Sequence, residues 1–253
     1  MAHWQQCGAL WVVEPDPRTD HRQGQSIAFI GGSYLAAAPQ LSYRRLLEAL
    51  AQRGWRVLVW SYVPGFDHQA QANEAWRAFR NAGPTSLRLG HSLGCKLHLL
   101  APDGGRGCDG LVAISFNNFS AERSVPLLAE LGQQFNVRSE FSPGPEETLR
   151  QVGSSYRQRR NLLVRFDRDG IDQSGRLLGV LQARADDRSE LLVLPGDHLT
   201  PASGGLRRQV LGAWADDPRR QRAVESIAGA ISHWARGPST GDDGLPSGPS
   251  RGS

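Results

Sequence analysis

The sequence predicts an α/β protein built on one doubly wound, mostly parallel sheet, and three observations support this prediction. Short apolar segments recur along the chain, amphipathic segments lie between them, and most of the apolar segments are continuous runs. Continuous apolar runs are typical of parallel strands that helices cover on both faces. Strands that alternate with helices in this way form a doubly wound sheet, and 253 residues suffice for one such domain.

Seven segments have the length and composition of buried strands. They are ALWVVE (9–14), SIAFIG (26–31), WRVLVWSY (55–62), SLRLGH (86–91), DGLVAISF (109–116), NLLVRF (161–166) and ELLVLP (190–195). Segments 41–54 and 70–83 have helical patterns, and both end in glycine, a common residue at helix C-termini. One face of the first helix is expected to carry Leu41, Leu46, Leu47 and Leu50.

One interval breaks the alternation of strands and helices. Residues 117–160 separate two strands by far more than one crossover needs, which predicts a helical cap insertion between two C-terminal strands. Within it, Pro145 followed by two glutamates is a good start signal for a helix. An ordinary pair of surface helices is the alternative. The folded domain is expected over residues 1–236, and residues 237–253, rich in Gly, Pro and Ser, are expected to be a disordered tail.

Composition and charge narrow the class of protein. No apolar run approaches the roughly 18 residues that cross a bilayer, and the N-terminus lacks a secretory pattern, so we expect a cytoplasmic protein without a transmembrane segment. The net charge of +4 comes from scattered arginines without interleaved aromatics, which argues against a nucleic-acid partner. The three cysteines lack C-x-x-C spacing, and dinucleotide-binding and phosphate-loop motifs are missing from the sequence, so neither a metal nor a cofactor is expected.

The strongest chemical signal is SLRLGHSLGCKLHLLA, residues 86–101, which reads as a strand, the turn GHSLG and a helix. A serine on so tight a turn must adopt a strained backbone, and the flanking Gly90 and Gly94 leave room for it. The turn lifts the hydroxyl of Ser92 above the sheet edge, where the positive end of the helix favours a developing oxyanion. This arrangement predicts a nucleophile, and a plain strand-to-helix turn is the alternative.

An acyl-transfer site also needs backbone N–H groups that face the oxyanion. The N–H of Leu93 is one candidate, and the loop after SIAFIGG offers Ser33 or Tyr34 as the second. Gly31 and Gly32 allow that loop to approach the nucleophile closely. We therefore expect the oxyanion hole between these two loops.

A serine nucleophile needs a base that is held by an acid. On a strand-to-helix turn of this kind the order along the chain is serine, acid, histidine. The loop after ELLVLP offers His198, and the loop after NLLVRF offers Asp167, Asp169 and Asp172. Both loops follow the C-terminal ends of strands, where ligands bind in open α/β sheets. We favour Asp169 as the acid, with Asp172 as the alternative, and expect turn or capping roles for the other aspartates.

These motifs resemble the α/β-hydrolase superfamily over roughly residues 9–236. The resemblance rests on IAFIGGSY, LLEALAQRGWRVLVWSY, LGHSLG, the acid turn FDRDGID and the terminal PGDH. Compared with the superfamily's acid turns of the type G-x-x-D, DRDGID places Asp169 at the catalytic acid. More narrowly, GHSLGCKLHLL, SEFSPGPEETL and the D-x-I-D turn look like an uncharacterised family of cyanobacteria and plant plastids. That likeness implies a photosynthetic organism and leaves the substrate open.

Two features depart from the superfamily pattern. Gly31 and Gly32 stand where many hydrolases have His-Gly, so the oxyanion loop can differ in shape. Lys96 lies one turn after Ser92, on a helix that is usually buried and apolar, and we expect its side chain to reach solvent from an outer face.

The leading hypothesis is a serine hydrolase of the esterase or thioesterase type, acting on a small-molecule acyl substrate. In it, Ser92, His198 and Asp169 form and hydrolyse an acyl-enzyme. One alternative is a non-catalytic protein that keeps the fold for binding or as a scaffold. Another is acyl transfer by the same residues to an acceptor other than water, which nothing in the sequence distinguishes from hydrolysis.

Overall fold

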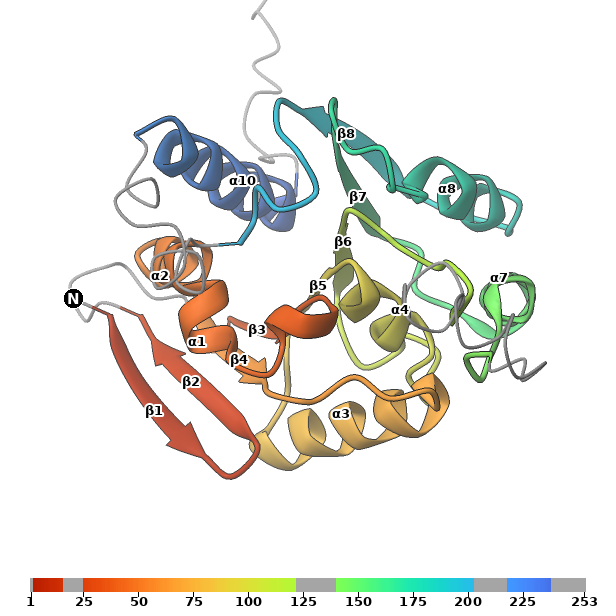
Figure 1. The fold of residues 1–253 in the computed structure, drawn as a ribbon, viewed down its shortest axis with the longest axis horizontal. Coiled ribbons are helices and arrows are strands. Elements are labelled where there is room, and N and C mark those ends of the chain that lie inside the picture. The colour runs from red at the N-terminus through yellow and green to blue at the C-terminus, as the bar shows by residue number, and fades with distance from the viewer. Residues whose placement is uncertain (1, 16–24, 122–139, 203–217, 238–253) are drawn as a thin grey trace, which may run out of the picture.

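The computed structural model describes residues 2–15, 25–121, 140–202 and 218–237. Within these ranges eight strands form one sheet in the order β1-β2-β4-β3-β5-β6-β7-β8 (Figure 1). The second strand runs antiparallel to both of its neighbours, whereas the six strands from β4 to β8 in this order are parallel. The predicted mostly parallel, doubly wound sheet is therefore confirmed.

All seven predicted strands are present, each within its predicted range. The strands are β1 (His3–Cys7), β2 (Leu10–Glu14), β3 (Ser26–Ile30), β4 (Arg56–Trp60), β5 (Leu87–His91), β6 (Gly110–Ile114), β7 (Asn161–Phe166) and β8 (Glu190–Leu194). The sequence pattern missed β1, because HWQQC is mostly polar and exposed. It forms the edge of the sheet, where a strand needs no apolar face on both sides.

Helices cover both faces of the sheet. They are the 3₁₀ helix η1 (Ser33–Leu35) and the α-helices α1 (Pro39–Ser42), α2 (Arg44–Ala51), α3 (His68–Ala82), α4 (Leu93–Leu99), α7 (Pro145–Ser155), α8 (Ser174–Gln182) and α10 (Pro218–Arg236). One face packs against α2 and α10, and the other against α3, α4, α7 and α8 (Figure 1). Along β4, Val57 and Val59 join the first core and Leu58 and Trp60 the second. This alternation explains why the parallel strands are continuously apolar.

The predicted helix over residues 41–54 is divided in two, and this corrects one expectation. Tyr43, between α1 and α2, has φ −119° and ψ 12°, which departs from helical geometry. Leu41 therefore belongs to a separate short helix and is 46% exposed, whereas Leu46, Leu47 and Leu50 are buried as expected.

The cap prediction is only partly covered by the structure. A helix does begin at Pro145, with Glu146 and Glu147 in its first turn. Residues 122–139 of the predicted cap and residues 238–253 of the predicted tail lie outside the described residues. Among the helices that are described, none combines the length and apolar character needed to span a membrane.

Candidate functional site

The loops after β3 and β5 lie where the strand order reverses. From β3 the chain continues to β4 on one side, whereas β5 pairs with the other side of β3. Connections that leave in opposite directions open a crevice at the carboxyl ends of the two strands. Ser92 directly follows β5, and Gly32 and Ser33 follow β3, so the sequence-predicted nucleophile and oxyanion loop both lie at this crevice.

The backbone of Ser92 is strained, with φ 54° and ψ −120°. Such a conformation costs a residue other than glycine roughly 1–3 kcal/mol. The two flanking glycines are sterically required. A Cβ on Gly94 would lie 2.0 Å from the carbonyl oxygen of Ile30, and a Cβ on Gly90 would lie 2.6 Å from the Cα of Cys95. The turn therefore holds α4 closer to the sheet than any larger residue permits.

The ring of His198 lies between Ser92 and Asp169. Its Nε2 is 3.1 Å from the Oγ of Ser92, and its Nδ1 is 2.8 Å from Oδ2 of Asp169. The aspartate follows β7 and the histidine follows β8, so two neighbouring parallel strands deliver both groups to the same sheet edge as Ser92. The Asp169 side chain is fully buried, while that of His198 is 18% exposed.

Opposing effects act on the carboxyl group of Asp169. Burial raises its pKa, but the nearby hydroxyl of Ser115 and the His198 ring lower it, and the net result is a pKa below the ordinary value. The group is therefore ionised at neutral pH. An ionised carboxylate beside Nδ1 favours the tautomer that carries its proton there, which leaves Nε2 to accept from the hydroxyl of Ser92.

The other two aspartates of this loop have local partners. Oδ1 and Oδ2 of Asp172 accept hydrogen bonds from the backbone N–H and the hydroxyl of Ser174, at 3.0 and 2.7 Å, where α8 begins. Burial raises the pKa of Asp172. Asp167 accepts from the backbone N–H of Gly196 at 2.8 Å and so joins the loops after β7 and β8. The alternative acid thus binds the first residue of α8, while Asp169 contacts the histidine.

A chain of hydrogen bonds that the sequence did not reveal connects the loops after β3, β5 and β8. The N–H of Gly32 donates to Oη of Tyr43 at 2.8 Å, and Oη lies 2.8 Å from Nδ1 of His91. The Nε2 of His91 lies 2.9 Å from the carbonyl oxygen of His198. Burial lowers the pKa of His91 to about 3, so its ring is neutral. Oη therefore donates its proton to Nδ1, and the Nε2–H donates to the carbonyl.

The candidate oxyanion donors lie beside the nucleophile. Leu93 is the first residue of α4, so its N–H has no carbonyl partner one turn earlier in the helix. A Cβ on Gly32 would lie 3.0 Å from the Cβ of Ser92, which shows how closely the loop after β3 approaches. Ser33 lines the cavity at Ser92. Tyr34 lies within η1, and its side chain is outside the described part of the structure.

A cavity of about 450 Å³ opens beside Ser92 and His198. Much of its wall is apolar, formed by Val63, Phe66, Leu93, Phe119, Phe141 and Ile171. Lys96 also lines it, and its position corrects an expectation. This side chain is only 1% exposed, and its Nζ donates to the carbonyl oxygen of Pro143 at 2.9 Å. The prediction that Lys96 reaches solvent is wrong, because the segment before α7 packs over this part of α4.

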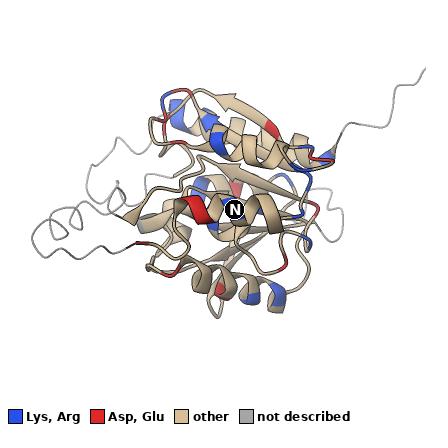
Figure 2. Ribbon diagram, turned by 90° about the vertical axis from the view of Figure 1, so that its right-hand side faces the viewer, with Lys and Arg blue, Asp and Glu red and all other residues tan. Residues whose placement is uncertain are grey.

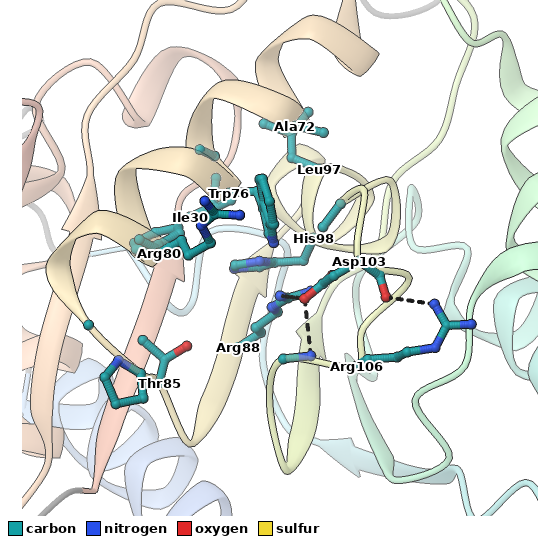
Figure 3. A pocket seen from close by; sticks show the side chains of 16 residues that line it. Ile30, Ala72, Trp76, Arg80, Thr85, Arg88, Leu97, His98, Asp103 and Arg106 are labelled. Atoms are coloured by element: carbon teal, nitrogen blue, oxygen red, sulfur yellow. Dashed lines mark hydrogen bonds and ion pairs between the residues drawn. The ribbon is translucent and has the colours of Figure 1, made fainter.

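A second cavity, of about 460 Å³, lies between α3 and α4 (Figure 3). Arg88 points toward Asp103 in its wall, with Nη1 2.9 Å from Oδ1, and Arg80 stacks on the ring of Trp76 at 4.7 Å (Figure 3). None of the described residues that line this cavity belongs to the predicted site. The crevice at Ser92 is therefore the candidate functional site.

Charged residues are spread over the molecular surface. Figure 2 shows basic residues (Lys and Arg) on several helices and loops, with acidic residues (Asp and Glu) among them. Several arginines form ion pairs: Arg44 with Glu48, Arg53 with Glu225, Arg56 with Glu14 and Arg176 with Glu146. Within the described ranges, no cluster of three or more His, Cys, Asp or Glu side chains could hold a metal ion.

Comparison with known protein families and curated proteins gives one match. A family model for a protein of unknown function (DUF1350) matches residues 3–216. No curated protein is similar enough in sequence to count as a relative.

Several solved structures are similar to the chain. Esterase B from Lactobacillus rhamnosis HN001 has a TM-score of 0.61 at 16% identity, over 93% of this chain and 86% of that one. A monoacylglycerol lipase from Paleococcus ferrophilus has a TM-score of 0.57 at 14% identity, over 83% of this chain and 93% of the lipase. A member of the α/β serine hydrolases from Xanthomonas campestris has a TM-score of 0.50 at 16% identity, over 98% of this chain and 96% of that protein. These likenesses confirm the α/β-hydrolase fold, and at such identities they show the fold alone.

Proposed function

The chain belongs to the DUF1350 family of proteins of unknown function, and we propose that it is a serine hydrolase that cleaves an ester or thioester. One observation carries the proposal. A single histidine, His198, lies within hydrogen-bond distance of both a strained serine, at 3.1 Å, and a buried carboxylate, at 2.8 Å. This is the arrangement of nucleophile, base and orienting acid that acyl transfer requires.

In the acylation step, Oγ of Ser92 attacks the acyl carbon while its proton moves to Nε2 of His198. Asp169 stabilises the resulting imidazolium through Nδ1–H. The oxyanion is stabilised by the N–H of Leu93 and by an N–H of Ser33 or Tyr34. When the tetrahedral intermediate collapses, the bond to the leaving group breaks, and His198 gives its proton to the departing alcohol or thiol.

The acyl-enzyme is then hydrolysed by the same groups. A water molecule attacks the acyl carbon and gives a proton to Nε2 of His198. Collapse of the second intermediate releases the carboxylic acid, and the proton on His198 returns to Oγ of Ser92. The cavity of about 450 Å³ suits a small-molecule acyl substrate. The insertion over residues 117–160 is proposed to form its cap, since Phe119 and Phe141 contribute to the wall.

The backbone strain supports catalysis over a purely structural role. Ser115 and Asp186 also have positive φ, but only at Ser92 does this backbone conformation occur together with a hydroxyl 3.1 Å from an imidazole nitrogen in the described structure. Strained residues cluster at active sites, where the strain can place a reacting atom.

A fluorophosphonate probe, which reacts with activated serines, tests the proposal. The wild type is expected to be labelled covalently, and Ser92→Ala is expected to remain unlabelled. Ser154→Ala, which removes an exposed hydroxyl on α7, is a matched control and is expected to be labelled like the wild type. A folded wild type that the probe leaves unmodified, or equal labelling of Ser92→Ala, contradicts the proposal.

A further inference from the structure

The cavity beside Ser92 contains three buried polar side chains that the reaction above does not use. They are His68, Lys96 and Asn118, whose exposed fractions are 2%, 1% and 4%. Burial of polar or charged groups costs free energy unless each finds a hydrogen-bond partner. Their hydrogen-bonding capacity therefore indicates what this part of the cavity binds.

Lys96 is the only lysine in the chain and lies one helical turn after Ser92, on the same face of α4. An ammonium group has three donors. One of them donates to the carbonyl of Pro143 at 2.9 Å, and Nζ also lies 5.8 Å from the ring centre of Phe141. Among the described residues no carboxylate lies within ion-pair distance of this ammonium, although the charges of Glu140 and Glu147 raise its pKa from farther away. Two of its three donors therefore have no direct partner among the described residues and are available to a ligand.

His68 lies next to this ammonium and is stacked on Phe141, with ring centres 4.2 Å apart. Neither of its ring nitrogens has a hydrogen-bond partner among the described residues. Burial, together with the positive charge of Lys96, lowers the pKa of His68 to about 3, so the ring is neutral at pH 7. It offers one donor and one acceptor.

Asn118 completes the polar part of the wall. Its Nδ2 donates to the carbonyl of Pro145 at 2.8 Å, whereas its Oδ1 is buried without a partner within the described segments. The side chain is thus fixed at one end, and its free carbonyl oxygen at the other end is an acceptor, which pairs with a donor and not with an anion.

We propose that Lys96 and His68 form a subsite for a carboxylate at the far end of the substrate's acyl chain. The inference rests on the proposed hydrolase function and names the substrate class of the same site: an ester or thioester of a dicarboxylic acid. Two donors, the ammonium of Lys96 and the N–H of His68, match the two oxygens of a carboxylate. Phe66, Phe141 and Ile171 provide an apolar wall for the chain between its two ends.

The charge of the subsite favours a carboxylate over a phosphate. Lys96 is the only Lys or Arg among the described residues that line the cavity, and the neighbouring His68 is neutral. One positive charge balances one carboxylate, whereas a phosphate dianion would leave an uncompensated charge in a buried wall.

The position of His198 indicates which part of the substrate carries the carboxylate. His198 must face the leaving group, because it protonates that group. The subsite at Lys96, one helical turn after Ser92, is accordingly assigned to the acyl part, so the carboxylate belongs to the acyl chain in this proposal.

Two esters of equal chain length test the subsite: mono-4-nitrophenyl adipate, which ends in a carboxylate, and 4-nitrophenyl hexanoate, which ends in a methyl group. The wild type is expected to prefer the adipate ester in kcat/KM. Lys96→Met is expected to lower this preference by roughly ten- to a hundredfold, as for the loss of a charged hydrogen bond. Arg77→Met, which removes a positive charge from an exposed position on α3, is the matched control and is expected to keep the preference.

A binding measurement separates failure of the subsite from failure of the hydrolase proposal. In Ser92→Ala protein labelled with ¹³C-lysine, the side-chain signal comes from Lys96 alone. Burial lowers the pKa of Lys96 to about 8; N-butyl adipamic acid is expected to shift this signal and to raise that pKa, whereas N-butylhexanamide is not. A shifted signal without ester hydrolysis by the wild type supports the subsite and contradicts the hydrolase. Hydrolysis of both esters with equal kcat/KM and an unmoved signal overturns the subsite and leaves the hydrolase standing.

Discussion

Nε2 of His198 lies 3.1 Å from Oγ of Ser92, although 106 positions separate the two residues in the sequence. The sheet explains this proximity. Ser92 follows β5 and His198 follows β8, and all strands between them in the sheet are parallel, so their carboxyl ends lie at one edge. The chemistry proposed for this protein depends on that edge.

The two aspartates after β7 are expected to respond differently to the same substitution. Asp169→Asn removes the charge that orients His198 and is expected to lower kcat by roughly a thousandfold or more, with little change in fold. Asp172→Asn weakens the hydrogen bonds to Ser174 at the start of α8, so it is expected to cost about 1 kcal/mol of stability and less than about tenfold in kcat. Ester hydrolysis and thermal unfolding of both variants distinguish these outcomes. A larger loss of kcat in Asp172→Asn than in Asp169→Asn would show that Asp169 is not the catalytic acid.

Gly94, two positions after the nucleophile, is expected to tolerate no side chain. Gly94→Ala would place a Cβ 2.0 Å from the carbonyl oxygen of Ile30, and we expect a loss of roughly 3 kcal/mol or more, or failure to fold. Gly179→Ala, in α8, is the matched control, because no atom lies within 4 Å of the added Cβ. That change is expected to stabilise the protein by about 0.5–1 kcal/mol. Urea unfolding measures both, and equal stability of the two variants would contradict the close packing of α4.

Tyr43 is expected to contribute to activity through the loops it connects. Tyr43→Phe removes the acceptor of the Gly32 N–H and the partner of His91, so we expect a loss of about 1–3 kcal/mol in stability and of roughly tenfold in kcat. Tyr156→Phe removes another buried hydroxyl, bonded to Asn161 at 3.0 Å at the start of β7, and is expected to affect stability alone. Equal kcat values for the two variants would show that the link to His91 has no role in positioning.

Acid is expected to destabilise the protein through its buried histidines. Burial lowers the pKa of His98 to about 3, below its ordinary value of 6.5. The unfolded chain therefore binds more protons than the folded protein, so the stability contribution is complete above pH 6.5 and is lost as the pH falls toward 3. For one such group the loss between pH 7 and pH 5 is about 2 kcal/mol.

His98→Gln tests this expectation, because glutamine can donate a hydrogen bond to the Leu89 carbonyl but cannot take up a proton. Its loss of stability between pH 7 and pH 5, measured by urea unfolding, is expected to be smaller than that of the wild type by about 2 kcal/mol. His233→Gln makes the same substitution at an exposed position on α10 and is the matched control, which is expected to keep the pH dependence of the wild type. An unchanged pH dependence in His98→Gln would contradict the pKa assigned to this ring.

Much of the fold followed from local sequence patterns. The continuous apolar runs indicated seven of the eight strands, and GHSLG between a strand and a helix indicated the turn at Ser92. His198 and Asp169 were selected because parallel strands end at a common edge, which is a property of the topology rather than of either loop alone.

Other features depend on packing that a sequence pattern does not contain. Nothing near Tyr43 or His91 in the sequence indicates that their side chains meet, because the contact joins the junction between α1 and α2 to β5 across 48 positions. The burial of Lys96 depends on the segment at Pro143, which lies 47 positions away. The cytoplasmic location and the photosynthetic source remain predictions from the sequence.

The central claim is that Oγ of Ser92 accepts the acyl group of the substrate. Mass spectrometry of the protein mixed rapidly with a 4-nitrophenyl ester, quenched in acid and digested, tests it most directly. The account predicts one added acyl group on the peptide that contains Ser92, and none in Ser92→Ala. Hydrolysis of the ester by the wild type with no acyl group on that peptide, or with the acyl group on another residue, would contradict it.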